Sequence, residues 1–294
     1  MKVLVTAAGG QVGHALTSLA KDTSFEIICL PRQQLDITET SSIQASIEQI
    51  KPDVLVNAAA YTAVDKAESD QDAAYLVNET GPENLARTCQ QVGIPLIHIS
   101  TDYVFSGEQA QPYTESDATG PLNIYGASKL GGDKVVAAIL EEHIILRTSW
   151  VFGRHGNNFV KTMLRLGKDR DELGVIDDQH GCPTAAEDIA DTIIGLCEAI
   201  YTGRAAWGLY HYCGQPATTW YGFASAIFDR AKSMGFDLGV NVKPITTRDY
   251  PTPAKRPKST ILDCSKIKNR YNIDQPDWRV RLDAIIQAEC AGQK

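Results

Sequence analysis

The first 150 residues alternate between short apolar runs and longer amphipathic stretches, and this alternation constrains the fold more than any other feature of the chain. The apolar runs, typical of buried strands of a parallel sheet, lie at 2–7, 26–30, 53–59, 95–100 and 143–150. Helical patterns lie between them, at 11–21, 40–50, 70–92 and 125–142. Strand–helix alternation predicts an α/β, doubly wound parallel sheet, which binds ligands at the carboxyl ends of its strands.

A glycine-rich turn, TAAGGQVG at residues 6–13, lies where the first expected strand passes into the first expected helix. Gly10 and Gly13 allow a tight turn and close packing of the helix on the strand, so that a pyrophosphate can approach the helix N-terminus. Such turns also occur for structural reasons alone. The position at the start of the chain favours a Rossmann-type dinucleotide site. The small residues that follow Asn57 leave room for the same ligand at the next strand end.

Beyond Trp150 the pattern changes to helical stretches at 157–168, 185–200 and 219–235, followed by a proline-rich segment at 250–260. We expect a dinucleotide-binding Rossmann domain over 1–150 and, over 151–294, mainly a smaller C-terminal substrate-binding lobe, some of whose segments return to the first domain. The proline-rich segment is expected to be ordered coil over a site.

Composition excludes several classes of protein. Net charge is -8 with no long run of one sign, whereas a nucleic-acid-binding protein normally carries a basic face. No apolar stretch approaches the ~18 residues of a membrane span, and the N-terminus lacks the apolar core of a signal peptide. The seven cysteines form no C-x-x-C pair, which is typical of reduced thiols in the cytosol. We therefore expect a cytoplasmic protein with no nucleic acid and no membrane among its partners.

A single Y-x-x-x-K pattern joins Tyr125 and Lys129 in one helical stretch. Positions i and i+4 share a helix face, so a lysine cation there is expected to lower the pKa of the phenol toward the range useful for proton transfer. The preceding strand ends in Ser100, Thr101 and Asp102, where a hydroxyl could hydrogen-bond the carbonyl that Tyr125 protonates. The pattern alone is weak, because a tyrosine and a surface lysine meet this spacing by chance.

Taken together, the segments TAAGGQVG, NAAAYTAVDKAE, STDYVF, PLNIYGASKL, RTSWVFG with a following NNF, and YPTPAKRP resemble the extended short-chain dehydrogenase/reductases. Among these, the chain is similar to the dTDP-4-dehydrorhamnose reductase family, from Met1 to about Asp283. The resemblance implies an NAD(P)H-dependent oxidoreductase that reduces the C4 ketone of dTDP-4-dehydro-L-rhamnose to dTDP-L-rhamnose, a nucleotide sugar used in polysaccharide biosynthesis.

The resemblance also implies the residues of the site. The catalytic trio is Thr101, Tyr125 and Lys129, in which Tyr125 gives a proton to the developing alkoxide, Lys129 holds the nicotinamide ribose and Thr101 hydrogen-bonds the carbonyl oxygen. The cofactor contacts are Gly10, Gln11, Val12 and Gly13 in the turn, Asp36 and Ile37 at the adenine, Ala60, Tyr61 and Thr62 at the nicotinamide, and again Tyr125 and Lys129. The substrate contacts are Thr101, Asp102, Tyr103, Trp150, Asn158 and, for the diphosphate, Arg256.

Two positions depart from the family pattern. Ala7 replaces the first glycine of the turn, so the phosphate turn is expected to differ slightly in shape. The acidic residue often found about twenty positions after the glycines is absent, and Pro31 and Arg32 stand there instead. Because a guanidinium suits a 2′-phosphate, Arg32 favours NADPH, with NADH as the alternative.

Three other functions known in the same superfamily are alternatives to a reductase. Sugar-nucleotide dehydratases carry Thr-Asp-Glu after the fourth strand, whereas this chain has Tyr103 in the third position, which argues against dehydration. An epimerase would use the same trio. A regulatory subunit resembling the beta subunit of methionine adenosyltransferase would bind nucleotide without turnover, but all three members of the trio are present here.

Some enzymes of the family form homodimers with a magnesium ion held by acidic side chains at the interface. Glu187 and Glu289 are the acidic candidates in this chain. The residue pattern by itself supports no metal ligand.

Overall fold

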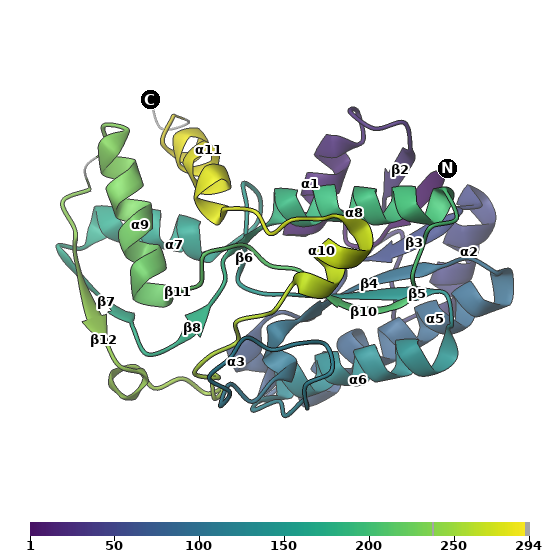
Figure 1. Ribbon diagram of the computed structural model, residues 1–294, viewed down its shortest axis with the longest axis horizontal. Coiled ribbons are helices and arrows are strands. Elements are labelled where there is room, and N and C mark those ends of the chain that lie inside the picture. Colours follow the sequence, from purple (N-terminus) through teal and green to yellow (C-terminus); the bar gives the residue numbers. More distant parts are fainter. Residues whose placement is uncertain (237, 292–294) are drawn as a thin grey trace.

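Over residues 1–236 and 238–291, which this computed structural model describes apart from the side chains of 290 and 291, a six-stranded parallel sheet forms the centre of the larger half (Figure 1). Its strands are β1 (Lys2–Val5), β2 (Glu26–Cys29), β3 (Val54–Asn57), β4 (Leu96–Thr101), β5 (His143–Thr148) and β10 (Gly208–His211), in the order β10-β5-β4-β3-β1-β2. The direction of strand succession reverses between β1 and β3. The doubly wound sheet is thereby confirmed, and this reversal is where such sheets bind dinucleotides.

Alternating side chains of the strands supply two hydrophobic layers, one on each face of the sheet. Val3 and Val5 pack with helices α1 (Gln11–Leu19), α8 (Ala186–Tyr201) and α10 (Ser265–Tyr271). Leu4 faces the opposite layer, with helices α2 (Thr40–Ile50), α5 (Gly81–Val92) and α6 (Ile124–Ile139). Since β10, α8 and α10 belong to the second half of the sequence, the chain returns to the first sheet. The division at residue 150 stays a prediction.

The stretch expected as one helix over 70–92 is instead three consecutive segments. Helix α4 (Gln71–Tyr75) continues through a π-helical turn (Leu76–Thr80) into α5, and the short α3 (Val64–Ala67) precedes them. The buried Asn78 lies in the π turn, where its Oδ1 accepts from the backbone N of Tyr61 at 2.8 Å and its Nδ2 donates to the carbonyl of Tyr61 at 3.1 Å. A π turn often marks a functional site, and this one fixes the loop after β3.

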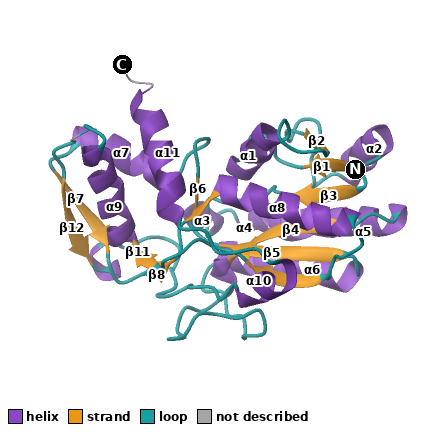
Figure 2. Ribbon diagram, turned by 45° about the horizontal axis from the view of Figure 1, so that its top comes forward, coloured by secondary structure: helices purple, strands orange, loops and turns teal. Residues whose placement is uncertain are grey.

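In the smaller lobe, α7 (Phe159–Asp169) and α9 (Trp220–Ser233) pack against the parallel pair β7 (Glu172–Ile176) and β12 (Asn241–Ile245), as Figure 2 shows. Helix α11 (Trp278–Ala291) packs against α9. The core of the lobe combines aliphatic side chains with aromatic ones, among them Phe152 and Phe223. Two short pairs, β6 (Val151–Phe152) with β9 (Thr184–Ala185) and β8 (His180–Gly181) with β11 (Thr218–Thr219), lie between lobe and sheet. The sequence analysis had not identified β7, β12, α10 or α11.

The proline-rich segment contains only an isolated bridge at Ser259 besides coil, as expected. From β12 it crosses to α3 and then rises to α10 (Figure 1). The six cysteines whose side chains are described are free thiols, whereas the side chain of Cys290 lies outside the described residues. Among the described helices, none is both long and apolar enough to cross a membrane.

Candidate active site

The backbone of the glycine turn after β1 is packed so tightly that no side chain fits at Gly13. A Cβ on Gly13 would lie 2.2 Å from the carbonyl oxygen of Ala7, and Gly10 donates its N–H to that same oxygen at 2.8 Å. Ala7 itself has a φ of 56°, a left-handed conformation that costs an alanine on the order of 1 kcal/mol. The turn thus keeps the tight geometry that a pyrophosphate needs at the N-terminus of α1, although alanine replaces the first glycine.

A cavity of about 660 Å³ extends from this turn along the carboxyl ends of β3, β4 and β5. It brings together most of the residues expected from the sequence, namely Gly10, Gln11, Val12, Ala60, Thr62, Thr101, Asp102, Tyr103, Tyr125, Lys129 and Trp150. Its wall also includes Val64, Ser149, Asn157 and Trp220. The first three lie within quoted motifs but were not singled out there, and Trp220 lies outside every motif. Gly13 does not line this cavity, but its lack of a side chain leaves room for the backbone of the turn at Ala7.

A smaller cavity of about 200 Å³ adjoins the turn and holds the expected adenine residues. These are Asp36 and Ile37, and Arg32, whose side chain is 71% exposed, lines the cavity with them. Tyr61 was expected beside the nicotinamide, but it lines this smaller cavity and not the larger one. Arg32 Nε donates to Asp36 Oδ2 at 3.0 Å. Ala7 and Ala60 line both cavities, so the two form one elongated surface suited to an extended dinucleotide.

Tyr125 lies near the N-terminus of α6, whose first turn is capped by Asn123. Its ring meets that of Tyr103 edge to face, with centroids 5.5 Å apart. Desolvation raises the pKa of Tyr125 to about 12, and a hydrogen bond with Thr101 opposes the shift. The expected lowering by Lys129 was wrong for this structure, since Lys129 is not among the groups that shift this pKa.

The physical reason is the direction in which the Lys129 ammonium points. Lys129 is buried, and its Nζ donates to the carbonyl of Ile99 at 2.7 Å and lies 3.5 Å from His98 Nε2. Burial lowers the pKa of Lys129 to about 8, and the nearby Asp133 opposes this. Asp133 accepts from Arg147 Nε at 2.9 Å, so a buried polar network that the sequence did not reveal lies beneath the trio.

Trp150 forms an aromatic wall on the side of the smaller lobe. Its ring stacks on that of Trp220, with centroids 3.6 Å apart and 6° between the planes. Its φ is 45°, and Gly181 leaves the space for the ring, since a Cβ there would come within 2.4 Å of it. The substrate role expected for Trp150 therefore includes a partner, Trp220, that comes from a distant helix.

Two residues expected to contact the substrate are engaged elsewhere. Asn158 caps α7 and donates to the carbonyl of Gly153 at 2.7 Å, while its neighbour Asn157 lines the cavity. Arg256 forms a two-pronged ion pair with Asp65, at 2.9 and 3.1 Å, and does not line the cavity. The amide of Asn158 is already used in the helix cap. The guanidinium of Arg256 is already paired with the carboxylate of Asp65.

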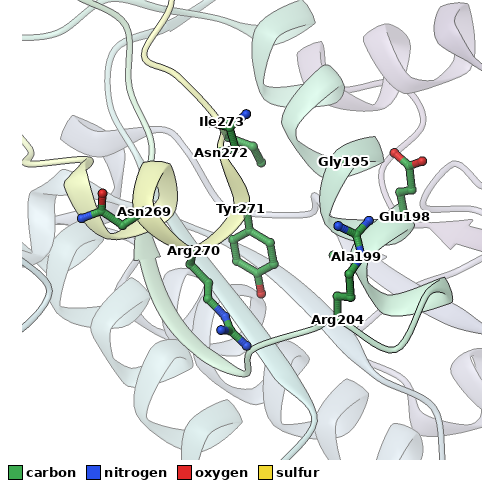
Figure 3. A pocket seen from close by; sticks show the side chains of 9 residues that line it. All are labelled: Gly195, Glu198, Ala199, Arg204, Asn269, Arg270, Tyr271, Asn272 and Ile273. Carbon is green, nitrogen blue, oxygen red and sulfur yellow. The ribbon is translucent and has the colours of Figure 1, made fainter.

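A separate cavity of about 490 Å³ shares no lining residue with the one around the trio. Figure 3 shows it between α8, which contributes Gly195, Glu198 and Ala199, and the residues Asn269–Ile273 of α10 and its end. None of the residues expected from the sequence to act in function lies there.

The acidic candidates for magnesium do not form a metal site within one chain. Glu289 accepts from Lys161 Nζ at 2.9 Å, which neutralises its charge. In the part of the chain that the structure describes, no group of three or more His, Cys, Asp or Glu side chains could hold a metal ion.

Comparison with known proteins agrees with this geometry. The family model described as the RmlD substrate binding domain matches residues 1–290. A dTDP-4-dehydrorhamnose reductase of Aggregatibacter actinomycetemcomitans is 45% identical over 287 residues, which cover 97% of this chain and 98% of that relative. The crystal structure of a dTDP-4-dehydrorhamnose reductase from Clostridium acetobutylicum has a TM-score of 0.91 at 39% identity, covering 99% of this chain and 100% of the other. The enzyme from Bacillus anthracis, solved in complex with NADP, has a TM-score of 0.90 at 37% identity, with 98% and 99% covered.

Proposed function

Because the chain belongs to the RmlD substrate binding domain family, we propose that it is an NADPH-dependent reductase of the C4 ketone of dTDP-4-dehydro-L-rhamnose, yielding dTDP-L-rhamnose. The observation that carries the proposal is the single cavity that joins the glycine turn to Thr101, Tyr125 and Lys129. A nucleotide cofactor on the turn and a carbonyl beside Tyr125 fit into one continuous space.

The cofactor would lie along the elongated surface described above. Gly10, Gln11 and Val12 would receive its diphosphate at the start of α1, and Asp36 and Ile37 would contact its adenine. The close-packed turn supports this assignment, because the backbone is free of side chains where a phosphate must approach. When bound, NADPH supplies the hydride for carbon C4 of the sugar.

Tyr125 would be the proton donor. With a pKa of about 12 it carries its proton at neutral pH, which is the form that a reduction consumes. A developing alkoxide is a stronger base than a phenolate, so the proton moves downhill from Tyr125 to the sugar oxygen. Thr101, within hydrogen-bonding reach of Tyr125, would donate to the same oxygen and stabilise its charge as it forms.

Lys129 would hold the nicotinamide ribose. The ring pair of Trp150 and Trp220 would form the wall for the sugar nucleotide, together with Tyr103. For Asn158 and Arg256, a direct substrate contact would require Asn158 to leave its cap or Arg256 to leave Asp65.

One assay separates this function from the alternatives. Purified protein is mixed with NADPH and dTDP-4-dehydro-L-rhamnose, and the loss of absorbance of the reduced cofactor is compared with the sugar product formed. The reductase oxidises one NADPH for each dTDP-L-rhamnose. An epimerase would convert the sugar with no net oxidation of NADPH, and a regulatory subunit would do neither.

A cytoplasmic location and a homodimer remain part of the proposal. Support for the location comes from the free thiols of the described cysteines, which are typical of a reducing compartment. Sedimentation at several protein concentrations, with and without magnesium, tests the dimer and its dependence on the metal.

A further inference from the structure

Thr260, at the end of the proline-rich segment, reaches the catalytic trio through a buried carboxylate. Its hydroxyl donates to Asp102 Oδ2, and Asp102 Oδ1 is 3.0 Å from Thr101 Oγ1. The exposed fractions of Thr101, Asp102 and Thr260 are 5%, 1% and 2%, so water does not compete for these bonds. The three side chains form an unbroken hydrogen-bonded chain that ends at the trio.

Thr101 cannot donate a hydrogen bond to Asp102 and to a substrate carbonyl at the same time, because a hydroxyl carries one hydrogen. When Asp102 is a carboxylate, Thr101 donates that hydrogen to Oδ1, and none is left for a substrate carbonyl. When Asp102 is protonated on Oδ1, the acid donates to Thr101, and the hydroxyl of Thr101 is free to donate into the cavity. The state of Asp102 therefore decides in which direction Thr101 donates.

Thr260 bears on which oxygen of Asp102 carries the proton. As long as the hydroxyl of Thr260 donates to Oδ2, that oxygen acts as an acceptor, and the proton of the neutral acid lies on Oδ1, beside Thr101. From these contacts we propose that Asp102 and Thr260 are positioning residues, which turn the hydroxyl of Thr101 toward the reacting carbonyl when Asp102 is protonated. The inference rests on the proposed reductase function.

The surroundings of Asp102 favour the neutral form more than those of an ordinary aspartate. Burial raises the pKa of Asp102 to about 6, against the hydrogen bonds from Thr260 and Thr101. The titratable groups that face it are the phenols of Tyr103 and Tyr125 and the thiol of Cys182, all of which have raised pKa values and are uncharged near pH 6. A change of rate near this pH would therefore report Asp102 itself.

The backbone around Thr260 is held independently of its side chain. Its N–H donates to the carbonyl of His180 at 2.9 Å, and the N–H of Ser259 donates to the carbonyl of Gly107 at 3.2 Å. Further along, Asn123 Nδ2 donates to the carbonyl of Lys255 at 2.9 Å, which ties the segment to the helix of Tyr125. Replacing the hydroxyl of Thr260 by a methyl group should leave this segment in place.

The test is the single-turnover rate of NADPH oxidation with dTDP-4-dehydro-L-rhamnose between pH 5 and 8. In the wild type the rate should fall about tenfold as Asp102 ionises. Asp102→Asn carries an amide that can always donate to Thr101, so its rate should not change across the Asp102 titration. Thr260→Val loses a bond that favours the carboxylate, so its fall in rate should move to higher pH. Thr260→Ser should restore the wild-type profile.

Ser259→Ala is the matched control in the same segment and should match the wild type. The affinity for NADPH and the melting temperature of each variant show whether it folds. The proposal is overturned if the wild-type rate rises through pH 6, if Asp102→Asn keeps the wild-type profile or loses turnover at every pH, or if Thr260→Val matches the wild type. A wild type that oxidises no NADPH at all would instead overturn the reductase function and the inference with it.

Discussion

The ammonium of Lys129 donates to the backbone carbonyl of Ile99, with Nζ and O 2.7 Å apart. Ile99 lies in β4, two residues before Thr101, so this bond fixes α6 on the strand that carries the proposed catalytic hydroxyl. Lys129 lines the cavity, and its ammonium is held by the backbone of the neighbouring strand. A bound ribose would meet a lysine whose position is already set by the backbone.

Lys129→Met should weaken NADPH binding roughly ten- to hundredfold, because a charged hydrogen-bond donor is worth about 1.5–3 kcal/mol. Burial lowers the pKa of Lys129 to about 8, so wild-type affinity should fall as pH rises through 8 and the amine loses its charge. The variant should lack this pH dependence. Titration calorimetry with NADPH at pH 7 and pH 9 measures both effects. The exposed Lys134→Met on the same helix is the control, and an unchanged affinity for Lys129→Met would leave Lys129 without a role in cofactor binding.

Gly13→Ala tests the phosphate turn. The new Cβ would lie 2.2 Å from the carbonyl oxygen of Ala7, a contact with backbone that cannot move away cheaply. We expect about 1–3 kcal/mol of destabilisation from overpacking and loss of NADPH binding. Gly195→Ala in α8 is the control, because its Cβ meets only Ile273 at an ordinary 3.6 Å. Thermal melting with and without NADPH checks both, and a Gly13→Ala variant that still binds the cofactor would refute the turn as its cradle.

The first half of the fold could be predicted because its signal is local. Each of the five expected strands is a short, largely apolar run, and each lies where the sequence placed it. The strands β7 and β12 were not predicted, because the two strands of the pair are far apart in sequence. In addition, β12 is half-exposed, and it carries polar residues and Pro244, which hide the alternation of a strand. Pairing of that kind comes from tertiary contacts and not from local pattern.

That the expected residues meet in one cavity could be predicted where a motif sits at a strand end, and not where tertiary contacts decide. The glycine turn follows β1, Thr101 ends β4, and Tyr125 and Lys129 lie in α6. By contrast, Asn158 bonds to Gly153 and Arg256 pairs with Asp65. Asp65 is 191 residues from Arg256, so no spacing in the sequence predicts their contact. Thr260 carries no motif, and its role becomes visible only through its contact with Asp102.

Arg32→Ala tests the preference for NADPH over NADH. The guanidinium lines the smaller cavity and is largely exposed, and its Nε pairs with Asp36 at 3.0 Å, so it can turn toward a 2′-phosphate. The variant should lose roughly ten- to hundredfold in kcat/KM with NADPH and almost nothing with NADH, as expected for a lost charge-assisted bond. Arg87→Ala, on the exposed face of α5, is the control. Equal losses with both cofactors, or none, would remove Arg32 from the site.

The most direct test of the account is the kcat of Tyr125→Phe with NADPH and dTDP-4-dehydro-L-rhamnose, both saturating. The substitution keeps the ring that packs on Tyr103 and removes only the proton donor. We predict that kcat falls by roughly two to four decades, the usual range for loss of a general acid, while the affinity for NADPH stays near that of the wild type. A variant that retains more than about a tenth of the wild-type kcat would contradict the assignment of Tyr125 as the acid.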